Sequence, residues 1–167
     1  MKRMFIVAIV LAVCGAVARQ AQQAGGSMHP AGTHVMITPE TVKWGPGPPS
    51  LPPGAEAAIL HGDPTVASEP FTLRLKFPDG YKVPPHWHPA DEYVTVLKGT
   101  LLMGVGEKFD MAGTKAMTEG TFGHMPKETR HYAAAKGETL IQVNAVGPFA
   151  VTYVNPADDP RTKKSTD

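Results

Sequence analysis

The sequence predicts an all-β protein built on one domain, either a sandwich or a barrel. Its 167 residues suit a single domain, because single domains commonly run to ~100–200 residues. Short apolar segments alternate with turn-rich clusters, and the chain carries 17 glycines and 17 prolines to make those turns. Helical spacing of apolar residues is weak throughout. Strands this short and this closely spaced favour a sandwich or barrel over an α/β domain.

The first 18 residues are predicted to be a secretory signal peptide. Two basic residues precede an apolar run over residues 4–13, and residues 16–18, Ala-Val-Ala, offer a cleavage site. The run is shorter than the ~20 residues of a spanning helix, so we expect no membrane span in the mature chain. We therefore expect an exported protein, periplasmic or secreted. The alternative is a lipoprotein through Cys14, although Val13 is bulkier than the residue usual before a lipidated cysteine.

Charge and cysteine content exclude several classes of function. Cleavage would remove two of the 16 basic residues and leave a net charge of about −1 against the 15 acidic ones. Without a basic patch we expect no nucleic-acid partner. Because Cys14 is the only cysteine, the mature chain would have no disulfide and no thiolate nucleophile or metal ligand.

The predicted strands begin after a small, polar segment without periodicity, residues 19–33, which we expect to be a flexible linker. Residues 34–37 are the first apolar segment, and residues 57–60 follow a stretch rich in proline and glycine. Residues 71–77, Phe-Thr-Leu-Arg-Leu-Lys-Phe, alternate apolar and polar side chains with a period of two. This alternation predicts a strand with one buried face.

Two further pairs of apolar segments each flank a Lys-Gly dipeptide. The first pair is residues 92–97 and 101–105, and the second is residues 130–135 and 138–143. A short apolar segment on each side of a glycine-containing turn is typical of a hairpin. The sequence therefore predicts two β-hairpins at these positions.

Three histidines and a glutamate are candidate metal ligands. His86 and His88 are two residues apart, so on an extended segment both side chains point to the same face. Glu92 opens the next predicted strand on its otherwise apolar face, where a carboxylate is costly to bury unless a cation pairs with it. His131, at the start of a distant strand, is the candidate fourth ligand. Such a site suits Mn, Fe, Ni, Cu or Zn and is poorly suited to Ca.

These residues lie in a pattern that resembles the two motifs of the cupin family. The first motif is matched at every spacing by Gly80, His86, His88, Glu92 and Gly99. The second is matched by Gly120, Pro126 and His131, whereas Glu128 and Ala135 stand where glycine and asparagine are expected. The resemblance covers about residues 34–155 and leaves residues 156–167 as a polar C-terminal tail.

The resemblance implies a single-domain jelly-roll β-barrel, also called a double-stranded β-helix. It further implies one divalent transition metal ion per chain, bound by His86, His88, Glu92 and His131. The alternative is a metal-free cupin pocket that the histidines merely line. The proline-rich approach to the barrel also resembles the metal-binding cupin domain of some anti-sigma factors. Because no helical sigma-binding segment precedes it in this sequence, we do not expect that partner role.

The register of the second predicted hairpin places Gln142 beside His131. If its Lys-Gly is a two-residue turn, the two residues lie directly opposite each other and share a face. We therefore expect Gln142 in the cavity as a catalytic residue that hydrogen-bonds a metal-bound water or a ligand. The alternative is a buried glutamine satisfied by the backbone. The same register in the first hairpin places Met103 opposite Val94 as core filling.

We expect a metal-dependent oxidoreductase of the dioxygenase or oxidase type, acting on a small organic molecule or carbohydrate. Four protein ligands leave one or two coordination positions open, as in catalytic sites, and Glu92 could detach and take a proton. Cupins with this ligand set also include isomerases, lyases and binding modules, so the family alone does not choose a reaction. Export slightly favours copper or zinc over iron, manganese or nickel.

Two other functions remain open at this point. One is a non-catalytic metal or small-molecule binding protein of the cell envelope, and the other is a metal-dependent hydrolase, lyase or isomerase. A homodimer is a further expectation, because cupins often pair through sheet edges.

Overall fold

The structure is a computed structural model that describes residues 34–162. The predicted signal peptide, the predicted linker and residues 163–167 lie outside this range. Residues 34–162 contain no α-helix and only three short 3-10 helices, Met111–Gly113, Pro156–Asp158 and Pro160–Thr162. Within the same range, no helix is long and apolar enough to cross a membrane. The all-β prediction is confirmed.

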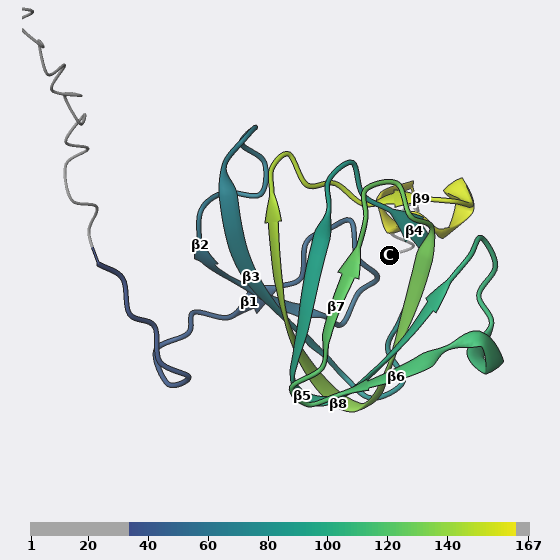
Figure 1. Ribbon diagram of the computed structural model, residues 1–167, viewed down its shortest axis with the longest axis horizontal. Helices are drawn as coiled ribbons and strands as arrows, with labels where there is room; N and C mark the ends of the chain where they lie inside the picture. The colour runs from purple at the N-terminus through teal and green to yellow at the C-terminus, as the bar shows by residue number, and fades with distance from the viewer. Residues whose placement is uncertain (1–33, 163–167) are drawn as a thin grey trace, which may run out of the picture. The chain divides into compact units, whose positions relative to one another are not determined.

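Nine strands form one continuous sheet that curls into a half-barrel (Figure 1). They are β1 (Gly45–Pro46), β2 (Glu56–His61), β3 (Pro70–Phe77), β4 (Lys82–Trp87), β5 (Glu92–Val105), β6 (Lys115–Thr118), β7 (Phe122–Met125), β8 (His131–Val146) and β9 (Thr152–Tyr153). The order along the sheet is β1-β2-β3-β8-β4-β9, and β5 pairs with β6, β7 and β8. All of these pairings are antiparallel.

The alternation of residues 71–77 produces the predicted strand, β3. Phe71, Leu75 and Phe77 are buried, whereas the polar residues between them are only partly covered. The strand predicted at residues 34–37 does not form, and that prediction was wrong. Val35 and Met36 in it are 58% and 77% exposed, so these side chains bury little apolar surface that could stabilise a strand.

The two predicted hairpins do not form either. β5 and β8 each continue through their Lys-Gly dipeptide and pair with each other, residues 93–105 against residues 131–144. The ladder is irregular where Gly99 bends β5, and Gly99 and Gly137 have φ values of +79° and +74°. A glycine with positive φ occurs both in tight turns and at bends within a strand. The Lys-Gly dipeptide alone therefore could not distinguish a hairpin turn from a bent strand.

The concave side of the sheet holds the apolar core. The inward side chains of β5 and β8 are at most 4% exposed at Val94, Val96, Leu101, Ile141 and Val143. Burying an aliphatic side chain of this kind contributes about 1.5–3 kcal/mol relative to leaving it exposed. This packed face fixes the starts of β5 and β8, where two of the predicted metal ligands lie.

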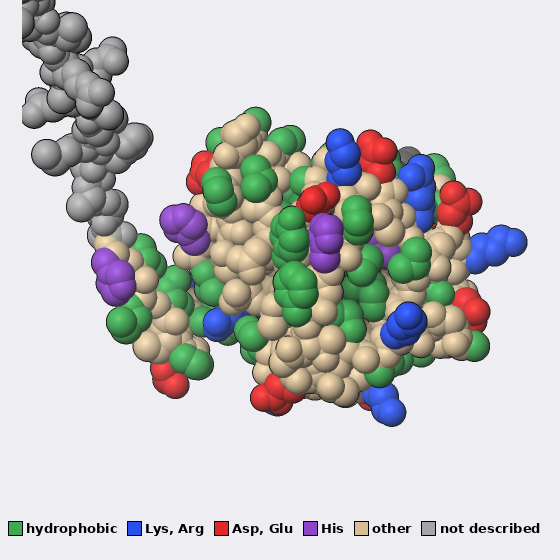
Figure 2. All heavy atoms as spheres, viewed as in Figure 1, with side chains coloured by type: hydrophobic (Ala, Val, Ile, Leu, Met, Phe, Trp, Pro, Cys, Tyr) green, Lys and Arg blue, Asp and Glu red, His purple; other side chains and the backbone are tan. Residues whose placement is uncertain are grey.

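The outer face of β5 and β7 is less fully covered. On the face that Figure 2 presents, basic and acidic side chains are interspersed and hydrophobic side chains gather over these strands. Tyr93 of β5 stacks on His124 of β7 with ring centroids 4.7 Å apart, and the Nε2 atom of His124 lies 3.5 Å from a carboxylate oxygen of Asp91. His124 is therefore a surface histidine.

Candidate metal centre

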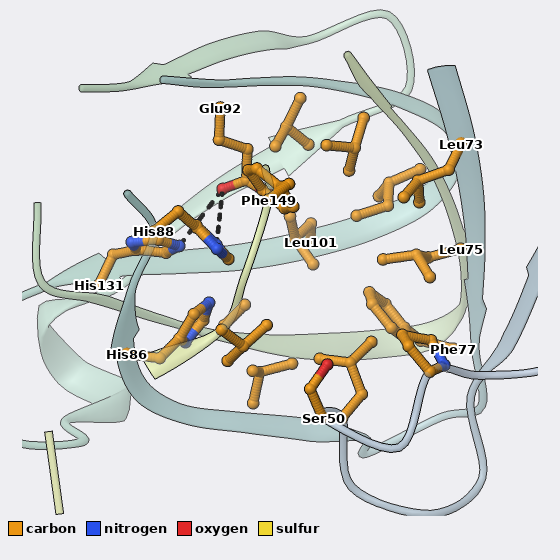
Figure 3. Close-up of a pocket in the computed structure, with 18 of the residues that line it drawn as sticks. Ser50, Leu73, Leu75, Phe77, His86, His88, Glu92, Leu101, His131 and Phe149 are labelled. Atoms are coloured by element: carbon orange, nitrogen blue, oxygen red, sulfur yellow. Dashed lines mark ion pairs between the residues drawn. The ribbon is translucent and has the colours of Figure 1, made fainter. Parts of the chain in front are cut away.

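The structure brings together all four predicted ligands (Figure 3). His86 lies on β4, His88 directly follows that strand, and Glu92 and His131 are the first residues of β5 and β8. His86 and His131 are cross-strand partners, so their side chains share a face of the sheet. The candidate ligand atoms of the three histidines lie within 4.8 Å of one another.

Glu92 completes this cluster from the third strand. Its Oε2 atom lies 3.3 Å from Nε2 of His131 and 3.7 Å from Nε2 of His88. All four residues are buried, with at most 8% of any one exposed. Glu92 therefore points inward at the start of an apolar strand face, as the sequence predicts, and imidazole side chains lie beside its carboxylate.

Hydrogen bonds to the backbone orient the three imidazoles. The Nδ1 atoms of His86, His88 and His131 donate to the carbonyl oxygens of Pro84, Ala150 and Thr129 at 2.8, 2.8 and 2.9 Å. A carbonyl oxygen can only accept, so each Nδ1 carries the hydrogen and each Nε2 is left to bind another group. Backbone acceptors of this kind fix ring orientation in metal-ligating histidines.

Two buried atoms of the cluster are suited to binding a cation. Nε2 of His88 and Oε2 of Glu92 have no hydrogen-bond partner among residues 34–162. A buried polar atom without a partner costs about 1–3 kcal/mol, and a bound cation would satisfy both atoms. Three imidazole nitrogens and one carboxylate oxygen form a ligand set suited to a first-row transition metal ion. The residues present therefore fit such an ion.

The protonation states also suit metal binding. Burial, reinforced by repulsion from the neighbouring histidines, lowers the pKa of His86 to about 3, and burial lowers the pKa of His88. Burial would raise the pKa of Glu92, but the adjacent His131 and the other nearby histidines outweigh it and lower that pKa. Burial would lower the pKa of His131, but the adjacent Glu92 carboxylate outweighs it and raises that pKa. His131 is therefore the histidine of the cluster that holds a proton most strongly, and a cation would have to displace that proton to bind.

The cluster faces a cavity of about 130 Å³. Figure 3 shows Leu73, Leu75 and Phe77 of β3 on the side of the cavity opposite the histidines. Ser50 is the only polar side chain lining the cavity, among residues 34–162, outside the four-residue cluster. A metal at the cluster would thus have open coordination positions facing an apolar space.

Phe149 is a wall residue that sequence reasoning did not predict. Its ring stacks on His88 with centroids 4.2 Å apart, and the next residue, Ala150, supplies the carbonyl that orients the same histidine. Both belong to the connection between β8 and β9, which folds back over the site. Nothing in the local pattern of this connection indicates that return, because it depends on the β4–β9 pairing.

The structure does not bring Gln142 to the site. Because β8 runs through the predicted turn, Gln142 lies opposite Arg74 rather than His131. Its neighbours Ile141 and Val143 line the cavity, so Gln142 points to the other face, where its Oε1 atom accepts a hydrogen bond from Nε of Arg74 at 3.2 Å. The prediction that Gln142 lies beside His131 was wrong, and the catalytic role inferred from it loses its basis.

Met103 shows the same error in register with a different outcome. It pairs with Ala133 of β8 and not with Val94, as the predicted hairpin would require. Both Met103 and Val94 nevertheless line the cavity, because each points to the concave face. The core-filling interpretation of Met103 is therefore consistent with the structure, although the pairing that suggested it was wrong.

Comparisons with known proteins agree with the fold and the motif. A family model described as a cupin domain matches residues 73–146, a range that contains all four clustered residues. No curated protein matches the chain.

Several solved structures are similar to the chain. The polyketide cyclase RemF from Streptomyces resistomycificus is similar at a TM-score of 0.59 and 17% identity, over 77% of this chain and 90% of that one. A "putative acetylacetone dioxygenase" from Methylibium petroleiphilum PM1 is similar at 0.58 and 22%, over 77% and 85%. KdgF from a Halomonas species is similar at 0.53 and 19%, over 69% and 96%. At these identities the likeness shows a common fold.

Proposed function

The chain belongs to the cupin superfamily, and from this premise we propose that it is a metal-dependent oxidoreductase of the dioxygenase or oxidase type. The proposal places one divalent transition metal ion at His86, His88, Glu92 and His131. The observation that carries it is the convergence of three oriented imidazoles and a buried carboxylate on an apolar cavity. A site that opens on a cavity is typical of a catalytic centre, whereas structural sites are closed by protein ligands.

The shared fold supports catalysis without choosing a reaction. Two of the similar structures bear the names of enzymes, a cyclase and a dioxygenase, so the fold accommodates enzymes of different classes. The choice among reactions rests instead on what lines the cavity of this chain.

The lining favours redox chemistry over hydrolysis. Among residues 34–162, the only cavity-lining groups outside the cluster are apolar side chains and Ser50. Hydrolases, lyases and isomerases usually position general acids and bases around the substrate, and within residues 34–162 this cavity offers only Glu92 for that task once the three histidines hold the ion. When bound, a redox-active ion would supply the electron-transfer and Lewis-acid chemistry that these side chains cannot provide.

Each residue of the site has a definable task. The three histidines hold their Nε2 atoms in place through their Nδ1 hydrogen bonds. Glu92 is the only carboxylate facing the cavity, among residues 34–162, and it could detach from the ion and accept a proton from a substrate. The apolar wall excludes water, which strengthens every charge interaction inside the cavity.

Metal content and oxygen consumption test the proposal together. Protein purified from the periplasm is analysed for bound metals, and oxygen uptake is then measured with candidate substrates. We expect a redox-active ion at near one per chain and substrate-dependent oxygen uptake. Zinc at full occupancy without oxygen uptake would contradict the oxidoreductase and favour the alternative, a non-catalytic metal-binding protein of the cell envelope.

Replacement of one histidine tests the ligand assignment. We expect His86→Ala to lose stoichiometric metal binding, because it removes one of the three oriented nitrogens from the cluster. His124→Ala is the matched control, since His124 is a surface histidine outside the cluster and should bind metal like the unaltered protein. Metal titration monitored by calorimetry measures both. Unchanged affinity in His86→Ala would refute the assignment.

Export and a homodimer remain part of the proposal. The leader, whose residues lie outside the described range, supports secretion, and we expect the mature protein to begin at Arg19. N-terminal sequencing of the periplasmic protein measures this directly. Light scattering of the same sample measures whether two copies associate.

A further inference from the structure

The apolar cavity restricts which ligands the site can bind, and this restriction indicates a class of substrate. Its volume of about 130 Å³ is close to that of the engineered cavity of ~150 Å³ that binds benzene. The part of a ligand that lies inside it therefore has roughly six to eight non-hydrogen atoms. A free carbohydrate of that size carries a hydroxyl group on most of its carbons, and each hydroxyl buried here would need a partner.

The wall offers almost no such partners. Apart from the four clustered residues, Ser50 is the only polar side chain lining the cavity within residues 34–162, and no Lys or Arg lines it there. A buried hydroxyl without a hydrogen bond costs about 1–3 kcal/mol by the evidence of protein variants. Dicarboxylates are disfavoured for the same reason, because their second charge would lack a cation.

The charge of the cluster selects one ionised group on the ligand. Histidine binds a metal as the neutral imidazole and glutamate as the carboxylate, so three histidines and one carboxylate would leave a divalent ion with a single net positive charge. In an apolar cavity, a net charge is costly unless an opposite charge lies beside it. A ligand with one anionic oxygen at the cluster would make the whole site neutral.

We infer that the substrate is a compact, mostly apolar molecule with a single ionisable oxygen, of the enol or phenol class, rather than a carbohydrate or a dicarboxylate. The oxygen lies at the histidine cluster, and the apolar body extends toward Leu73, Leu75 and Phe77 on the opposite wall (Figure 3). This inference rests on the proposed function, since it places the oxygen beside the bound ion.

A ligand panel tests the inference without turnover. Calorimetric titrations with toluene, phenol, D-glucose and oxalate are carried out on metal-free protein and on zinc-loaded protein, in which the ion is redox-inactive. We expect toluene to bind both forms alike, because it needs only the apolar wall. Phenol should bind the zinc-loaded form at least about tenfold more tightly than the metal-free form, and glucose and oxalate more weakly than phenol in both.

The two ways of failing are distinguishable. If zinc does not bind, the proposed function fails, while toluene still measures whether the cavity accepts an apolar body. If zinc binds but glucose or oxalate binds more tightly than phenol, the substrate class is overturned and the metal site stands. Equal affinity of phenol for the two forms would also overturn the inference, because it would place the oxygen away from the cluster.

A change in the far wall provides a second test. Leu73 lines the cavity and is only partly buried, so Leu73→Ala enlarges the space with little disturbance of the core. We expect 2-naphthol to gain at least about tenfold in affinity for the zinc-loaded variant, with phenol changed by less than about threefold. Leu97→Ala, which shortens a partly buried leucine outside the cavity, is the control and should leave both affinities unchanged. Equal responses to 2-naphthol in the two variants would contradict the placement of the apolar body.

Discussion

At the scale of single residues, backbone carbonyls decide what the histidines can do. Each of the three imidazoles donates its Nδ1 hydrogen to a backbone carbonyl, so the rings are oriented before any ligand binds. The sequence spacing predicted that His86 and His88 share a face, because alternation in a strand is a local property. It could not predict Ala150 as the partner of His88, because that contact joins two distant segments.

The buried histidines make the stability of the metal-free protein depend on pH. The pKa of His86 is about 3 in the fold and has its ordinary value of 6.5 in the unfolded chain. As the pH falls from 6.5 toward 3, the unfolded chain takes up a proton that the folded state excludes. Stability is therefore complete above pH 6.5 and falls below it, by up to about 1.4 kcal/mol per pH unit for this group. His131 has the opposite sign, since its raised pKa adds stability below pH 6.5 that is lost as pH rises through the folded value.

Urea unfolding of metal-free protein at pH 7, 6 and 5 measures this dependence. His86→Gln is the control, because its side chain does not titrate, and we expect a shallower loss of unfolding free energy in it toward low pH. The same slope in both proteins would show that His86 is not the group responsible.

Glu128 has a left-handed backbone conformation that is unfavourable for any residue with a Cβ atom. Its φ is +63°, and its N–H donates to the carbonyl of His88 at 2.8 Å, which ties the turn before β8 to the site. The left-handed region costs a non-glycine residue about 1–2 kcal/mol, and the cupin pattern has glycine here. We expect Glu128→Gly to raise the free energy of unfolding by about 0.5 kcal/mol, after the entropy that glycine adds to the unfolded chain.

Denaturant titration measures the effect, with Lys127→Gly as the control. Lys127 is the preceding residue and has no positive φ, so glycine should lower stability there. A loss of stability in both variants would show that the strain at Glu128 is smaller than the entropy of the added glycine.

At the scale of elements, the two bent strands determine the architecture. β5 and β8 pair along almost their whole length, and each carries its glycine at the corner. Apolar and polar side chains alternate along β3 and β5, so the sequence predicts which residues of these strands point inward. Whether a Lys-Gly dipeptide reverses the chain or only bends it depends on which strand lies beside it, and no local pattern contains that information.

The two corner glycines should tolerate substitution differently. A Cβ atom at Gly99 would lie 2.3 Å from the carbonyl oxygen of Glu138 and 3.0 Å from Cα of Thr139, whereas Gly137 has no atom within 4 Å of that position. Gly137→Ala therefore meets only the cost of positive φ, about 1 kcal/mol, and Gly99→Ala should cost about 3 kcal/mol or more. Equilibrium unfolding compares them, and equal losses would contradict the close approach of β5 and β8 at this corner.

At the scale of the whole molecule, a bound ion should stabilise the fold. The cluster unites β4, β5 and β8, so it exists only in the folded state. An ion that binds the native protein alone adds about 2.7 kcal/mol when its free concentration is 100 times its Kd. We expect zinc to raise the Tm of metal-free protein and a chelator to reverse the rise, as measured by calorimetry. His86→Ala should show no rise, and a rise of equal size in it would mean that zinc binds elsewhere.

We also expect the pairing of His86 with His131 to form late during folding. The two residues belong to segments far apart in the chain, and contacts of this kind form late because closing the intervening loop costs conformational entropy. Until then, His86, His88 and Glu92 form an incomplete set on a local segment. An ion would therefore be captured by the completed fold, and the compartment in which folding ends, with its own supply of metals, would decide which ion that is.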